Sequence, residues 1–170
     1  MKGLNKLMQN IVLAMSEDVE LMKLLHYNIA DKDLNDLPEP ELDEVLGVKL
    51  LDYTYVPDVT EDANSYISLS FDNIEKANSR KAMSSRSETL KQLDIVVTAF
   101  THYSLIKFYG GNRLLAIMDR VEKIFTQARM EDVVGKFDLS VAKEVTSIPK
   151  YNGYDIIFRI TTIPSELGVR

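Results

Sequence analysis

Apolar residues open the chain at steps of three and four, the spacing of one face of an α-helix. They predict an amphipathic helix and comprise Leu4, Leu7, Met8, Ile11, Val12 and Met15. Ser16 follows as a candidate N-cap, with Glu17 and Asp18 in the next turn, where the helix dipole favours acidic side chains. The spacing resumes at Val19 and predicts a second short helix, or a bent continuation of the first, that ends near Tyr27.

Alternation of apolar and polar residues predicts strands in the middle of the chain. The alternating segments are residues 48–55, 66–71 and 93–101. One face of the last and longest segment carries Leu93, Ile95, Val97 and Ala99. Only a polar, basic connector, residues 72–91, separates it from the segment before. We therefore expect these two strands to form an extended hairpin with a long arm.

Helical spacing returns after Gly110-Gly111, with Asn112 as the expected N-cap. The apolar stripe comprises Leu114, Leu115, Ile117, Met118, Val121, Ile124 and Phe125. Two closing strands are expected over residues 139–148 and 154–163, with turn signals at Pro149 and Asn152-Gly153 between them. This order predicts an α+β fold, with a mainly antiparallel sheet and the helices packed on one face.

Length and composition indicate one domain over residues 1–170. The chain has 170 residues, of which 45% are hydrophobic and 27% charged, which is ordinary for a globular protein. Residues 31–44 interrupt this pattern with a run of acidic side chains, and Pro38 and Pro40 prevent a regular helix there. We expect residues 31–44 to form an exposed acidic loop or linker, and residues 72–91 the arm of the hairpin; both are insertions in the domain.

The charge balance argues against broad nucleic-acid binding. The formal net charge is −6, whereas duplex contact needs a basic surface. No cysteine is present, which excludes disulfides and thiolate metal sites and fits a reducing compartment. The apolar run 11–15 is too short for a signal peptide, and no segment has the length of a membrane span. We expect the protein in the cytosol, or in a particle assembled there.

No pattern for catalysis, a cofactor or a metal is found. His26 and His102 lack ligand spacing such as HExxH, and no GxSxG supports a serine nucleophile. Gly110-Gly111 precede a helix but lack the lysine and hydroxyl residue of a phosphate loop. The acidic segment lacks the central glycine of a calcium-binding loop. We therefore expect a protein without enzymatic activity, catalytic residues or cofactors.

Charged side chains in the two insertions are the candidate partner contacts. The alternative is that both insertions are simply solvated. The candidates are Lys76, Arg80, Lys81, Arg86 and Lys91 in the arm, and Asp36, Glu39 and Glu41 in the acidic segment.

Four stretches together give a resemblance to the tail terminator (tail completion) proteins of tailed bacteriophages. The stretches are the opening helix IVLAMSEDVELMKLL, the hairpin SYISLSFDN to LKQLDIVVTAF, the helix NRLLAIMDRVEKIF and the closing strand YNGYDIIFRITTIP. They span nearly the whole chain, but none is a catalytic signature.

The resemblance implies a virion protein of the tail or neck. Its subunits would form a ring, expected to be a hexamer, that caps the tail tube, ends tail elongation and provides the surface for head joining. Its partners would be copies of itself, the tail tube protein, and in some particles the sheath and neck proteins. DNA would pass through the lumen without specific binding, and no membrane is involved.

A closed ring needs two different, complementary faces on each subunit. We expect one face to be the arm and the following strand, residues 86–100. Another head–tail connector or neck ring protein is an alternative that shares these features. A small enzyme or ligand-binding domain is a third possibility, which a deep pocket with convergent ionisable groups would favour.

Overall fold

The computed structural model describes residues 2–58, 62–76, 90–127, 137–145 and 148–160. It has the α+β architecture expected from the sequence, with a five-stranded sheet in the order β1-β2-β3-β7-β6. The strands are β1 (Leu50–Leu51), β2 (Ser65–Lys76), β3 (Leu90–His102), β6 (Asp138–Val145) and β7 (Tyr151–Ile160). All neighbouring pairs are antiparallel except β1 and β2. A two-stranded ribbon of β4 (Lys107–Phe108) and β5 (Gly111–Asn112) leads into the last helix.

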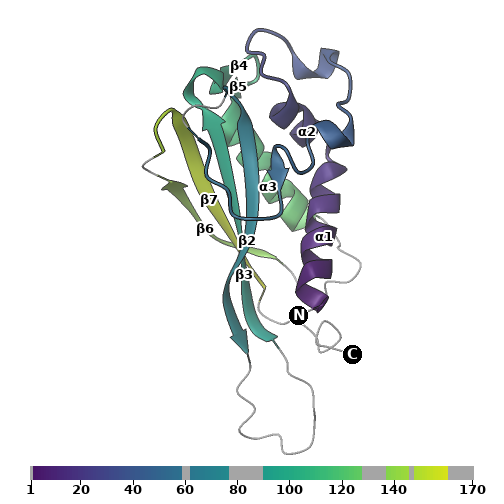
Figure 1. Cartoon of the computed structure of the whole chain (residues 1–170), viewed down its shortest axis with the longest axis vertical. Helices are drawn as coiled ribbons and strands as arrows, with labels where there is room; N and C mark the ends of the chain where they lie inside the picture. Colours follow the sequence, from purple (N-terminus) through teal and green to yellow (C-terminus); the bar gives the residue numbers. More distant parts are fainter. Residues whose placement is uncertain (1, 59–61, 77–89, 128–136, 146–147, 161–170) are drawn as a thin grey trace, which may run out of the picture.

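Helices cover one face of the sheet, as predicted (Figure 1). They are α1 (Lys2–Ser16), α2 (Val19–His26) and α3 (Arg113–Gln127). Their apolar stripes pack on the alternating side chains of β2, β3 and β7, which are excluded from solvent. The strand residues of this core are Ile67, Leu69, Leu93, Ile95, Val97, Ala99, Ile156, Phe158 and Ile160. Burial of each of these side chains except Ala99 contributes about 1.5–3 kcal/mol relative to leaving it exposed.

The break between the first two helices differs from the expected one. Asp18, rather than Ser16, is the N-cap of α2, and its carboxylate accepts a hydrogen bond from the Leu21 N–H at 2.9 Å. Ser16 ends α1, and its hydroxyl donates to the Leu13 carbonyl at 2.8 Å. Ser16 is buried while Asp18 also reaches Arg120 on α3, so tertiary contact decides which residue caps.

Asn112 lies at the expected start of α3, where its side-chain oxygen accepts from the Leu115 N–H at 3.2 Å. The predicted apolar stripe is buried at five positions, whereas Met118 is half-buried and Leu115 is 48% exposed. Leu115 lies beside the buried stripe, so the prediction of its burial, which depended on its apolar character alone, is wrong.

Two expected strand boundaries are wrong. The segment 48–55 contributes only the two residues of β1. The Val45 carbonyl accepts hydrogen bonds from the N–H groups of Lys49 and Leu50, so the chain forms a turn up to the start of β1. The final turn lies at Pro149 and Lys150, with Lys150 at φ 68°, and not at Asn152-Gly153. Asn152 and Gly153 both belong to β7. Residues 146–147 and 161–163, which were expected to belong to the two closing strands, lie outside the described part of the chain.

Gly153 is needed in β7 for close packing rather than for a turn. A Cβ atom there would lie 2.6 Å from Cδ1 of Phe100 on the neighbouring strand. Phe100 can therefore lie flat across β7, on the sheet face opposite the helices. There it forms a second apolar cluster with Tyr66 and Tyr151, and Tyr55 from the segment after β1 packs against it.

Candidate interaction surfaces

The β2–β3 hairpin extends beyond the rest of the sheet (Figure 1). β7 pairs with β3 only as far as Leu93, whereas β2 and β3 continue to pair as far as Lys76 and Leu90. The predicted hairpin is therefore confirmed, and its outer part has no third described strand beside it. Lys76 and Lys91 lie on these two strands; Arg80, Lys81 and Arg86 lie outside the described residues.

An ion pair between a buried carboxylate and a partly exposed guanidinium holds the base of this arm. Arg159 of β7 donates two hydrogen bonds to Asp94 of β3, at 2.7 and 2.9 Å, and Asp94 is only 1% exposed. The side-chain amide of Asn73 donates to the same carboxylate at 3.0 Å. Asn73 has φ 46°, and the β2–β3 register shifts immediately after Asp72. These contacts fix the point where the hairpin leaves the sheet.

The charge of Asp94 follows from this geometry. The hydrogen bonds from Arg159 lower the pKa of the carboxyl group, and the bond from Asn73 acts in the same direction against the effect of burial. Asp94 is thus held ionised by its partners although water does not reach it.

The acidic segment 31–44 is an exposed loop that is tied to α2. Tyr27 donates through its hydroxyl to the Pro38 carbonyl at 3.1 Å, and Lys23 donates to the Leu34 carbonyl at 3.0 Å. Leu34 is buried beneath the loop. The predicted contact residues Asp36, Glu39 and Glu41 all lie on its exposed surface.

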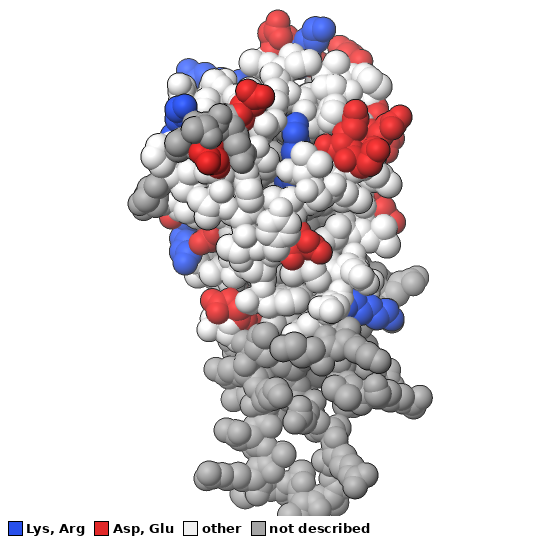
Figure 2. Space-filling view, viewed as in Figure 1, with Lys and Arg blue, Asp and Glu red and all other residues white. Residues whose placement is uncertain are grey.

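The described members of the two sets of predicted contact residues are not brought together. The acidic segment and the hairpin arm lie at opposite ends of the long axis of the molecule (Figure 1). Acidic side chains gather near the end opposite the arm (Figure 2). A single partner would therefore have to span the domain to contact both.

The expected contact face over residues 86–100 stays a prediction, but its strand part cannot make contact through a strand edge. β3 is the central strand, with β2 on one side and β7 on the other, so neither of its edges is open over residues 93–100. Strand order depends on which distant segment pairs with β3. The alternation of apolar and polar residues along one strand does not reveal this.

Arg113 is a buried cation that the sequence reading missed. It is 0% exposed, and its guanidinium donates to four backbone carbonyls and to none of the described carboxylates. The acceptors are the carbonyls of Leu24, Tyr27, Ile29 and Leu105. Burial lowers the pKa of Arg113 to about 10, which leaves it charged at neutral pH. Spacing was the sequence signal that could have indicated its burial, since Arg113 lies on the same face of α3 as Ile117 and Val121.

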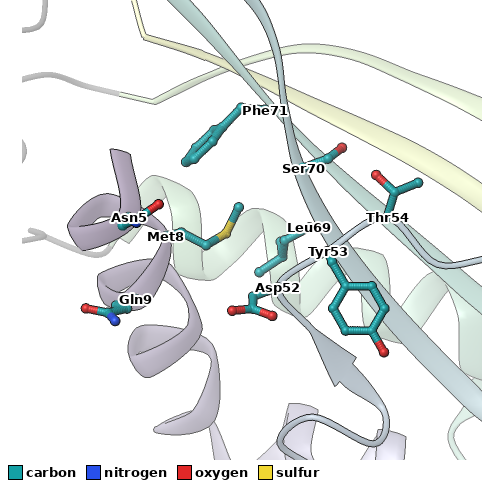
Figure 3. A pocket seen from close by; sticks show the side chains of 9 residues that line it. All are labelled: Asn5, Met8, Gln9, Asp52, Tyr53, Thr54, Leu69, Ser70 and Phe71. Carbon is teal, nitrogen blue, oxygen red and sulfur yellow. The ribbon is translucent and has the colours of Figure 1, made fainter. Parts of the chain in front are cut away.

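A groove of about 550 Å³ lies between α1 and the outer edge of β2 (Figure 3). Its walls combine apolar side chains with uncharged polar ones, and Asp52 is the charged residue among them. The lining residues are Asn5, Met8, Gln9, Asp52, Tyr53, Thr54, Leu69, Ser70 and Phe71.

The histidines occupy separate sites. His26 Nε2 lies 3.7 Å from Glu44, and His102 Nδ1 lies 2.7 Å from the Ser104 hydroxyl. Within the described ranges no three histidine or acidic side chains are placed to bind a metal ion. No described helix has the length and apolar character to cross a membrane.

Comparisons with known proteins give one family. A chain from the structure "Virion of native gene transfer agent (GTA) particle" is 17% identical, with 71% of this chain and 82% of that chain covered, but its TM-score of 0.43 is too low to carry an argument. No curated protein matches the chain. The YomW family model matches residues 18–160, from the N-cap of α2 to the end of β7. Because this match covers most of the chain, the protein belongs to the YomW family.

Proposed function

We propose that the protein is a structural subunit of a phage virion, and that its copies form a ring on the tail tube. This ring would end tail elongation and present the surface to which the head joins. The proposal is supported by the four sequence stretches that resemble tail terminator proteins. In the fold these stretches form α1 and α2, the long hairpin, α3 and β7.

The observation that carries the proposal is the projecting hairpin. Beyond Leu93, as far as Leu90, the described chain places no strand on the other side of β3, while the pairing of β3 with β2 continues. Isolated two-stranded ribbons are marginally stable in water, so a long one usually packs on something else. A neighbouring component of a tail is a suitable support for it.

The opposite end of the molecule suits a second, different neighbour. Asp36, Glu39 and Glu41 are exposed there on a loop that is anchored to α2. A ring between a tube and a head needs two such unlike ends. Another neck ring has the same need, so the position of the protein in the particle separates these two functions.

The test is deletion of the arm between Asn73 and Ser87, compared with deletion of the whole gene. Loss of the protein is expected to give overlong tails of variable length that do not join heads. Arm deletion is expected to give the same tails from a chain that still folds, as judged by thermal unfolding. Tails of normal length without the protein would refute the terminator function. If the protein labels at the portal instead of the tube end, the neck-ring alternative holds.

A further inference from the structure

One edge of the sheet lies open beside α1. β1 adjoins β2 only at Ile67 and Ser68, and the described chain places no other strand on that side. The Ile67 N–H donates to the Lys49 carbonyl at 2.7 Å, so the backbone groups of Ile67 point to this edge. Alternate residues of a strand direct their peptide groups to the same side. The N–H and C=O of Phe71 therefore also point to the open edge.

The groove has the position of a missing strand. α1 forms its far wall and lies on the β2 side of α3 (Figures 1 and 3). Met8 reaches from α1 toward Leu69, and Phe71 continues the apolar wall along β2 (Figure 3). An extended segment in this space would pair with β2 and turn alternate side chains beneath α1.

The opposite edge of the sheet is formed by β6, which no described helix covers. β6 is exposed at every residue except the half-buried Val145. Leu139 is opposite Phe158, and Ala142 is opposite Ile156, which places both on the helical side of the sheet. No described helix shields them, and Leu139 is 42% exposed. Thus no described helix lies above β6, whereas α1 lies above a place where the described chain has no strand.

The strand directions of the two edges are compatible. β2 is antiparallel to β3, β3 to β7 and β7 to β6, so β6 runs antiparallel to β2. Rotation about an axis parallel to the strands preserves these directions. A second copy placed in this way offers its β6 to β2 as an antiparallel neighbour, with its helices on the same side of the extended sheet.

The charges at the two edges are mixed, because β6 carries Asp138 and Glu144 as well as Lys143, and Lys143 lies 3.7 Å from Asp155 of its own chain. Asp52 lines the groove, and Asp72 lies exposed further along β2 on the face away from the helices. Lys143 of β6, whose side chain is 61% exposed, lies on the same face because it is opposite Asp155. Lys143 is the one group of β6 whose charge is opposite to that of Asp52 and Asp72, and opposite charges on adjacent strands favour pairing.

We propose that β6 of one copy pairs with β2 of the next, with Leu139 and Ala142 of the first copy beneath α1 of the second. The contact joins two different edges, so it repeats head to tail and closes into a ring when the rotation allows. The inference deepens the proposed function, because it supplies the contact by which the ring would form.

The absence of native cysteine allows a direct test. One chain carries Ala142→Cys and a second, of different mass through a tag, carries Met8→Cys. A short bismaleimide is added to each chain alone and to the mixture, both in concentrated solution and in assembled particles. Crosslinks are expected in the mixture, between unlike chains only. Crosslinks within either single variant, or none in the mixture under both conditions, would overturn the proposal.

A matched pair of substitutions supplies a second measurement. Leu139→Glu places a charge on β6, and Leu13→Glu places one on α1 at a residue that is 58% exposed and does not line the groove. We expect Leu139→Glu to weaken self-association about tenfold or more, which is the effect of losing about 1.4 kcal/mol. Leu13→Glu should leave association unchanged. Equal effects of the two substitutions would contradict the edge contact.

Tail length separates this inference from the proposed function. If unlike chains crosslink and tail length does not depend on the protein, the edge contact stands and the terminator function fails. If tails need the protein but the crosslinks are absent, only the edge contact fails.

Discussion

Replacement of Arg113 by methionine tests how the helical layer is held together. Methionine retains an unbranched apolar stem but removes every donor of the guanidinium. The carbonyls of Leu24, Tyr27, Ile29 and Leu105 would then lose the hydrogen bonds that Arg113 donates at distances including 2.9, 2.6 and 3.1 Å. Three of these carbonyls lie at the end of α2 or just after it, where the helix dipole also favours a cation.

The expected loss is large relative to the stability of a domain. A hydrogen bond from a charged donor contributes about 1.5–3 kcal/mol, but removal of the cation also removes its own cost of burial. From these opposing effects we expect Arg113→Met to lower the free energy of unfolding by about 3–5 kcal/mol, out of a typical total of ~5–15 kcal/mol. Arg113→Lys should lose less, because it keeps the charge but cannot reach all four acceptors.

Urea unfolding followed by circular dichroism measures these differences. Arg120→Met is the matched control on the same helix, because Arg120 is 21% exposed and pairs with Asp18 and Glu20 near the surface. We expect it to cost about 1 kcal/mol. If Arg113→Met costs no more than Arg120→Met, the four carbonyl contacts do not hold the helices together.

Three further predictions concern the sheet and its packing. The partners of Asp94 lower its pKa in the folded protein, so the ionised carboxylate should stabilise the fold above pH ~4, and this effect should fade as pH falls through the lower folded-state pKa. Asp94→Asn should therefore lower the free energy of unfolding by about 1–3 kcal/mol at pH 7. It should also flatten the acid side of a stability–pH curve measured by urea unfolding. Gly153→Ala should lower the free energy of unfolding by about 1–3 kcal/mol, and with it the melting temperature, through collision with Phe100, and Phe100→Leu should partly restore both; an unchanged melt would disprove the collision. Val121→Asp should unfold the domain or make it insoluble, whereas Leu115→Asp, at an exposed position of the same helix, should not; an unaltered thermal melt of the Val121 variant would contradict the packing of α3.

Local patterns were sufficient for the layers of the fold. The apolar alternation of β3 and the helical spacing of α3 both report burial on one side, and the structure buries Leu93, Val97, Ile117 and Val121 completely. Such signals are local, because one face of one element determines them. The fold class and the hairpin followed from them.

Features that depend on distant segments were not predictable in this way. Arg113 meets carbonyls 84 to 89 residues earlier in the chain, and nothing beside it in the sequence reveals them. Asn152-Gly153 has the composition of a turn, yet Gly153 serves the close approach of Phe100 from another strand. The open edges of β2 and β6 likewise depend on the strand order. The acidic loop was foreseen, but its anchoring to α2 was not.

The place of β7 in the sheet has a consequence for biosynthesis. β7 fills the position between β3 and β6, so β3 gains its second neighbour only after residue 160 has emerged from the ribosome. Until then the nascent polypeptide leaves the edge of β3 that pairs with β7 unpaired, a form that favours misassembly on crowded polysomes. Subunits should therefore become competent to join one another only after β7 has been synthesised, which delays assembly without any separate regulator.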